Sequence, residues 1–166
     1  MGFDVSGLNP KINKHESEYE YYRNDTEIWK EKNEELRKKY YKEMDDYYNA
    51  NPGVYFRNNV WWWRPLWAYV VEKCGDFMSD EDIGGGAYND GHEISAEKAF
   101  KIGMKLKKLI ENGDVKLREV EITNENKELA KSEDKEIRFM SSYPFSEDNV
   151  EHFANFCIES GGFAIC

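Results

Sequence analysis

The stretch Val54–Trp67 contains tryptophan, arginine and asparagine side chains at a higher density than any other part of this chain. If the stretch is extended, neighbouring side chains point to opposite faces, so Trp61, Trp62 and Trp63 cannot all enter one core. At least one of them must then serve another surface. Pro65 favours extended backbone at Arg64 and suits the first position of a helix. The stretch therefore predicts a strand, bent at its asparagine pair, that leads directly into a helix.

Two interpretations of this stretch are open. Tryptophan and tyrosine bury much area and often anchor small cores, in which case the asparagines serve a turn and the arginines stack on rings. Alternatively, the stretch is a binding surface, where aromatic planes stack a flat ligand and arginine forks hold phosphate or carboxylate. Both interpretations can hold for different residues of the same stretch.

The length of 166 residues suits one domain with a real core. The net charge of −10 argues against nonspecific binding of nucleic acid or anionic membranes, but it allows a surface that mimics nucleic acid and occupies a basic partner. Three widely spaced cysteines are a poor disulfide framework. The sequence shows no secretion signal and no run of membrane-spanning length, so we expect a soluble protein of the cytoplasm.

Helical periodicity and capping residues predict the helices of this chain. The expected helices are Thr26–Ala50, one that begins at Pro65 and ends near Gly75 to Met78, one that follows Ser95 and ends at Asn112, and one that follows Ser146 and ends at Gly161. Residues 79–93 look most like a loop, with a turn at Tyr88–Gly91.

Alternation of apolar and polar residues predicts the strands. The expected strands are an N-terminal one before Pro10, the Tyr55 segment, Val115–Ile122, a short one at Ile137–Met140 and a terminal one at Phe163–Cys166. Mixed signals without regular strand–helix alternation favour an α+β fold. We therefore predict a single domain over residues 1–166, with four or five helices packed on a small mixed or antiparallel sheet.

Residues 15–51 differ from the rest of the chain, because glutamate, lysine and tyrosine dominate there. We interpret this segment as a helical insertion. Its helix either lies across the core with a charged outer face or reaches out to a partner protein or a second subunit. The second arrangement would allow a homo-oligomer through residues 26–50.

The sequence contains no recognisable catalytic, cofactor or metal signature. Its three histidines are isolated, no paired Cys/His spacing suggests zinc, and nucleotide-binding fingerprints and nucleophile elbows are absent. The one place that could assemble acid–base chemistry is where Asp90, His92 and Glu93 approach Arg57 and Arg64. We therefore expect a binding protein without cofactor or metal rather than an enzyme, with a small nucleotide hydrolase or lyase as an alternative.

Four motifs carry a resemblance to a known group of proteins. They are the start Met-Gly-Phe-Asp-x-x-Gly-x-Asn-Pro, the run Tyr-Phe-Arg-Asn-Asn-Val-Trp-Trp-Trp-Arg-Pro-Leu-Trp, the turn Tyr-Asn-Asp-Gly and the ending Glu-Ser-Gly-Gly-Phe. Together they resemble a group of small phage- and prophage-associated proteins. The segment 15–51 is longer than is usual for that group. The resemblance implies a phage context, in which small acidic proteins often oppose host defence.

These observations lead to a functional hypothesis and one competitor. We expect a pocket for a small anionic, nucleotide-like molecule, which in a phage could be an immune signalling nucleotide. The residues expected to line it are Arg57, Asn58, Asn59, Trp61, Trp62, Trp63, Arg64, Tyr88, Asn89 and Asp90. The competing hypothesis is an acidic inhibitor that covers a basic groove of a host defence protein with the helix of residues 26–50. Neither hypothesis requires direct contact with nucleic acid or a membrane.

Overall fold

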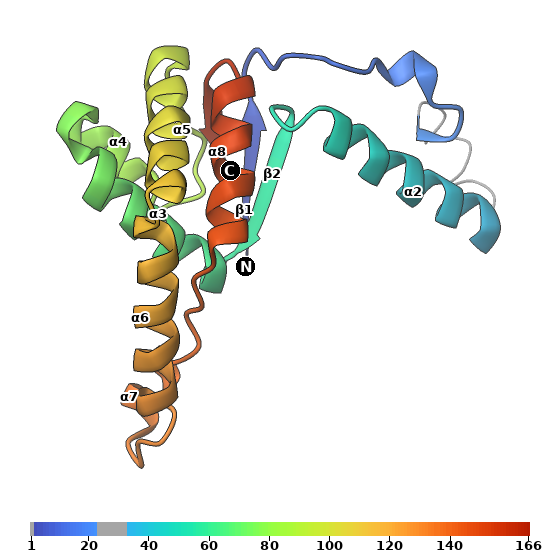
Figure 1. The fold of residues 1–166 in the computed structure, drawn as a ribbon. Coiled ribbons are helices and arrows are strands. Elements are labelled where there is room, and N and C mark those ends of the chain that lie inside the picture. Colours follow the sequence, from blue (N-terminus) through green and yellow to red (C-terminus); the bar gives the residue numbers. More distant parts are fainter. Residues whose placement is uncertain (1, 23–32) are drawn as a thin grey trace.

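The structure, a computed structural model, describes residues 2–22 and 33–166. Its sheet has four antiparallel strands in the order β2-β1-β4-β3. The strands are β1 (Gly2–Gly7), β2 (Tyr55–Asn59), β3 (His92–Ile94) and β4 (Phe163–Ile165). The expected N-terminal and terminal strands are therefore confirmed, and they pair with each other in the centre of the sheet (Figure 1).

The two faces of the sheet differ in chemistry. Phe3, Val5 and Phe163 are buried on one face, where the helices pack. The intervening residues lie on the other face, where Ser6 and Glu93 are exposed and Asp4 and Ala164 are half-buried. One covered and one solvated face is the usual arrangement of an antiparallel sheet, and it explains the alternation in the N-terminal sequence.

Seven α-helices lie within the described ranges, more than the four or five expected. They are α2 (Glu34–Ala50), α3 (Val60–Cys74), α4 (Asp80–Gly85), α5 (Ala96–Glu111), α6 (Asp114–Leu129), α7 (Lys135–Met140) and α8 (Glu147–Glu159). Two short 3₁₀ helices, η1 (Glu16–Glu18) and η3 (Gly75–Phe77), accompany them. The α+β class is confirmed, and the additional helices come from segments expected to be strand or loop.

Helices α5 and α8 lie side by side over the sheet (Figure 1). Their backbones approach closely at Gly103, where an added Cβ would come within 2.7 Å of the Ala154 carbonyl oxygen. The rings of Phe153 and Phe156 on α8 contact those of Phe56 and Phe163 on the sheet. These contacts hold the core against the covered face.

The strand expected at Val115–Ile122 is wrong, because these residues belong to α6. On this helix Val115 is buried and Ile122 is half-buried, whereas Leu117 and Val120 are 68% and 50% exposed. Apolar residues on two sides of a helix produce an alternation that resembles a strand. Arg118 joins α6 to α3 through Glu72, with an N–O distance of 2.6 Å.

The short strand expected at Ile137–Met140 is also wrong, because these residues form the end of α7. Its N-cap is Asp134, whose side chain accepts from the Glu136 and Ile137 backbone N–H groups. The segment 79–93, expected to be a loop, contains α4 and β3. Ser79 and Asp82 form a reciprocal capping box at the start of α4, a pattern typical of helix N-termini.

Helix α2 extends away from the sheet and its covering helices (Figure 1). Its only buried residue is Tyr47, so the arrangement is that of a projecting helix rather than one laid across the core. Within the described ranges the helix begins after Asn33, its N-cap, and the start expected at Thr26 lies outside them.

The segment 15–50, which we call the arm, begins and ends at neighbouring points. The Asn51 side chain accepts from the Lys14 backbone N–H at 3.0 Å and donates to the Lys14 carbonyl at 2.8 Å. The residues that flank the arm therefore lie next to each other.

No helix among the described residues is both long enough and apolar enough to cross a membrane.

Candidate functional site

The backbone changes from strand to helix at Asn59, inside the tryptophan-rich stretch. The Asn59 side chain accepts hydrogen bonds from the backbone N–H groups of Trp61 and Trp62, at 3.0 and 3.2 Å, and so caps α3. The extended geometry expected up to Pro65 is therefore wrong. Pro65 lies inside α3, where it has no N–H to offer the carbonyl four residues before it.

The three tryptophans consequently have different environments. Trp63 is 1% exposed and its ring stacks between Phe3 and Trp67, whereas Trp61 and Trp62 are half-buried. Both interpretations of the stretch are thus represented, because Trp63 is a core anchor and the other two contribute to the surface.

Five of the ten expected site residues line hollows, and they are divided among three hollows rather than gathered in one. Arg57 and Asn58 line a hollow of about 550 Å³ between β2 and α8, which we call the β2–α8 groove. Arg64 lines a hollow of about 470 Å³ between α3, α6 and α7, which we call the α3–α6 groove. Trp63, Arg64 and Tyr88 line a third hollow of about 420 Å³ beside Trp67.

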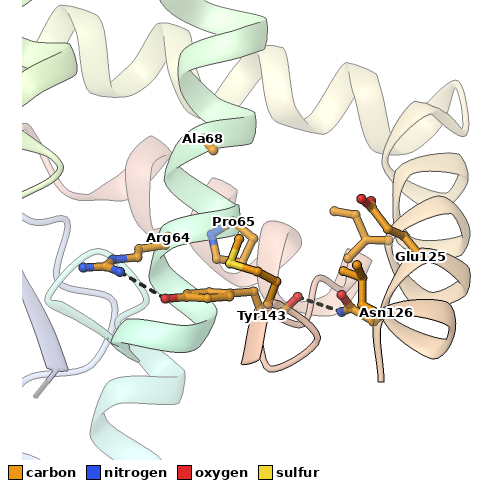
Figure 2. A pocket seen from close by; sticks show the side chains of 9 residues that line it. Arg64, Pro65, Ala68, Glu125, Asn126 and Tyr143 are labelled. Carbon is orange, nitrogen blue, oxygen red and sulfur yellow. Dashed lines mark hydrogen bonds between the residues drawn. The ribbon is translucent and has the colours of Figure 1, made fainter. Parts of the chain in front are cut away.

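The α3–α6 groove has an apolar wall and two polar ends (Figure 2). At one end the Arg64 guanidinium donates to the Tyr143 hydroxyl at 3.0 Å. At the other end lie Glu125 and Asn126, and the Asn126 amide nitrogen donates to the Tyr143 carbonyl at 2.9 Å. Trp61 supports this groove from outside, with its ring centroid 5.1 Å from that of Tyr143. The apolar lining consists of Pro65, Ala68, Ile122, Leu129 and Met140.

The charges at the two ends of the α3–α6 groove have no opposite charge beside them. Among residues 2–22 and 33–166, no ion pair involves Arg64 or Glu125. An apolar hollow with a few convergent polar groups is the usual form of a small-molecule site.

The β2–α8 groove is more polar. Asn58 and Asn149 form part of its wall, with the Asn58 amide nitrogen donating to the Asn149 side-chain oxygen at 3.1 Å. Arg57 lies on the rim with its side chain 66% exposed, and its Nε is 3.5 Å from an oxygen of Asp4. The described residues that line it are Tyr48, Asn49, Pro52, Tyr55, Phe56, Arg57, Asn58, Asn149, His152, Asn155 and Phe156.

The remaining expected residues lie away from both grooves. Asn89 donates from its side chain to the Gly2 carbonyl at 3.3 Å, and Asp90 is exposed. Tyr88 is 65% exposed on the turn. The turn therefore lies beside Gly2, at the beginning of β1, instead of joining Arg57 or Asn58 in one pocket.

His92 does not assemble with Asp90, Glu93 and the two arginines. Its Nε2 lies 3.2 Å from an oxygen of the buried Asp82, which also accepts from Lys98 and from the Ser79 backbone N–H. Burial alone would raise the pKa of Asp82, but the hydrogen bonds from Lys98, Ser79 and His92 hold it well below its usual range. We interpret this cluster as a clasp between α4, β3 and α5, since His92 lines none of the hollows described above.

Two of the three cysteines are held in the core as protonated thiols. Cys74 and Cys157 are buried, and burial raises the pKa of the Cys74 thiol to about 12 and that of Cys157 well above its ordinary value. Thiols with such pKa values stay protonated at neutral pH. No group of three or more metal-ligating side chains occurs in the part of the chain that the structure describes.

The sequence did not indicate the residues that distant segments of the chain contribute to the two grooves. Asn126 and Tyr143 complete the α3–α6 groove, and Asn149 and Asn155 complete the β2–α8 groove. No spacing in the sequence links them to Arg57 or Arg64. The one available signal was the pair Ser146–Glu147, which fixes the start of α8 and hence the face that carries both asparagines.

Comparisons with protein-family models, with curated proteins and with solved structures found no match to this chain.

Because of the Asp82 clasp, the free energy of unfolding should decrease as the pH falls. Because folding lowers the pKa of Asp82, its contribution is complete above the unfolded pKa of about 4 and is lost as the pH falls below that value. We predict that Asp82→Asn lowers the free energy of unfolding by about 2 kcal/mol at pH 7.

Urea unfolding at pH 7 and at pH 3 measures this effect, with Asp80→Asn, an exposed neighbour on the same helix, as the control. The difference between wild type and Asp82→Asn should shrink at the lower pH. A difference that is the same at both pH values would show that the clasp does not depend on an ionised Asp82.

Proposed function

We propose that this protein binds a small anionic, nucleotide-like molecule in the α3–α6 groove. The observation that carries the proposal is Arg64, whose guanidinium lies at one end of an apolar hollow (Figure 2) and forms no ion pair with a carboxylate in the described part of the chain. Such a group offers a phosphate several N–H donors in a fixed fork. The Tyr143 hydroxyl, which accepts from Arg64, holds the guanidinium in place.

The apolar wall supports a flat ring as the other half of the ligand. Pro65, Ile122 and Leu129 supply surfaces against which a base can be buried, and the Tyr143 ring lies across the floor of the hollow (Figure 2). A volume of about 470 Å³ is in the range of ordinary small-molecule sites.

The polar end opposite Arg64 favours a base that donates hydrogen bonds. Glu125 is an acceptor when ionised, and the Asn126 amide nitrogen is already engaged with the Tyr143 carbonyl, which leaves its side-chain oxygen. Guanine presents two adjacent N–H donors that suit a carboxylate, whereas uracil presents one. We therefore infer a preference for guanine nucleotides.

The resemblance to phage- and prophage-associated proteins suggests a role for such binding. In a phage, a protein that sequesters a signalling nucleotide would weaken a host defence that depends on that nucleotide. This role requires that the protein binds a nucleotide.

Thermal-shift measurements against guanine, adenine and uracil nucleotides at millimolar concentration test the proposal. We predict an increase in Tm that is largest for guanine nucleotides, since a ligand that binds only the folded state stabilises it. Arg64→Ala should weaken the affinity about tenfold to a hundredfold, because charge-assisted hydrogen bonds contribute about 1.5–3 kcal/mol.

Two further variants sharpen this experiment. Arg57→Ala removes the guanidinium of the other groove and should leave nucleotide binding unchanged. Glu125→Gln should reduce the preference for guanine over adenine. The absence of any shift with all nucleotides, or an equal loss in Arg57→Ala and Arg64→Ala, would contradict the proposal.

A second function, contact with a basic host protein through the arm, is favoured by one observation. The arm contains eleven acidic and seven basic residues, so it carries four of the ten net negative charges on 36 of 166 residues. Its helix α2 projects from the rest of the protein (Figure 1). A projecting, negatively charged segment can reach a basic groove on another molecule.

Excision of the arm tests this second function. Because Lys14 and Asn51 are hydrogen-bonded to each other, a short glycine linker can join them. We predict that the shortened protein still unfolds cooperatively and still binds nucleotides, but no longer captures basic host proteins in pull-downs at low salt. Undiminished capture by the shortened protein would refute a role for the arm, and capture that is insensitive to salt would refute its electrostatic origin.

A further inference from the structure

Among the described residues, β2 is an edge strand of the sheet, and the hydrogen-bond pattern identifies its free side. Asp4 exchanges two backbone hydrogen bonds with Cys166, so its backbone groups point toward β4. The direction of the backbone N–H and C=O groups alternates along an antiparallel strand. The backbone groups of Phe3 and Val5 therefore point toward β2, where these residues pair with Asn58 and Phe56.

The same alternation fixes the outward-pointing groups of β2. Because Phe56 and Asn58 direct their backbone groups toward β1, Tyr55 and Arg57 direct theirs to the free edge. Gly7, two residues after Val5, also directs its backbone N–H toward this part of the chain, since it donates to the Val54 carbonyl at 3.0 Å. This bond supports the alternation on which the outward direction of Tyr55 and Arg57 depends. Unpaired N–H and C=O groups along an edge are a template for another strand.

The β2–α8 groove runs along this free edge. Four consecutive residues, Tyr55 to Asn58, line it. Side chains of consecutive strand residues point to opposite faces, so one hollow can touch all four only where it follows the edge itself. The opposite wall is the face of α8 that carries Asn149, His152 and Asn155. A hollow between an edge strand and a helix has the form of an extended-peptide site.

The charge of the groove indicates what kind of peptide it would accept. Among the described residues that line it, none is a carboxylate, although the chain contains 33 acidic residues. Arg57 and His152 are the groups that can be positive there, and both are mostly exposed, although Asp4 and Asp148 lie 3.5 and 3.7 Å from them. An acidic side chain placed directly across from Arg57 would form a favourable cross-strand pair.

We propose that an extended, acidic segment of a partner protein binds in the β2–α8 groove by adding a fifth strand beside β2. Its backbone pairs with the outward groups of Tyr55 and Arg57. An acidic side chain of the segment lies across from the Arg57 guanidinium, and the next side chain points toward the asparagines of α8. This site is separate from the nucleotide site proposed at Arg64, and neither depends on the other.

Hydrogen exchange followed by NMR tests the geometry and the binding together. In the free protein the amides of Phe56 and Asn58 should exchange slowly and those of Tyr55 and Arg57 rapidly. The probe is a synthetic peptide of alternating valine and glutamate, capped at both ends. On binding, it should slow the exchange of the Tyr55 and Arg57 amides.

Two peptide controls separate strand addition from other binding. A peptide with alternate backbone nitrogens methylated cannot complete the ladder and should not bind. A peptide with lysine in place of glutamate should bind about tenfold more weakly, since the charge pair with Arg57 is lost.

Two substitutions at position 57 separate the contribution of the Arg57 charge from that of its backbone N–H. Arg57→Ala removes the charge and should weaken the valine–glutamate peptide about tenfold. Arg57→Pro also removes the outward N–H, which no bond to β1 requires, and should weaken it about tenfold further. If Arg57→Pro does not fold, the methylated peptide still tests the ladder.

The proposal is overturned if the valine–glutamate peptide does not bind at millimolar concentration. It is also overturned if the methylated or lysine peptide binds equally well, or if the protected amides lie outside β2. Nucleotide binding by Arg57→Ala is measured in parallel and is expected to be unchanged, so failure at one site is not confused with failure at the other.

Discussion

The packing of Trp63 is the interaction on which the rest of the structure depends. Its ring stacks on Phe3 of β1 and on Trp67 of α3, with centroids 5.2 and 5.4 Å away, and its indole N–H donates to the Gly86 carbonyl at 2.7 Å. One buried side chain thus joins the sheet, α3 and the end of α4, with its polar group satisfied. Gly86 permits this arrangement, since an added Cβ would lie 1.8 Å from a Trp67 ring carbon.

The Asn59 cap decides how the neighbouring residues are distributed. Because the helix begins immediately after it, Trp63 enters the core while Trp61 supports Tyr143 at the surface. Arg57 remains on the strand and Arg64 on the helix, so the two guanidiniums line different grooves. A stretch that is continuous in sequence therefore serves one core and two separate surfaces, which is why a nucleotide and an acidic peptide need not compete.

Local sequence patterns were sufficient to predict a helix or strand where one face of that element is buried. The alternation of Phe3 and Val5 predicted β1, and Ser95 with the apolar stripe after it predicted α5. The same reasoning failed at 115–122, where apolar residues lie on two sides of α6. It also fails at Asn59, because Pro65 suits the first position of a helix and so predicts a later start than the Asn59 cap gives. The grooves could not be predicted, since Tyr143 meets Arg64 from 79 residues away and no sequence period connects them.

Exchange rates of the indole N–H groups, measured by NMR, test this division of the tryptophans most directly. Trp63 and Trp67 donate to the carbonyls of Gly86 and Ile83, at 2.7 and 3.1 Å, and are buried. Their indole signals should exchange orders of magnitude more slowly than those of the half-buried Trp61 and Trp62, because such protection follows the opening of the core. Equal exchange for all four would contradict the helical start at Val60 and, with it, the separation of the two grooves.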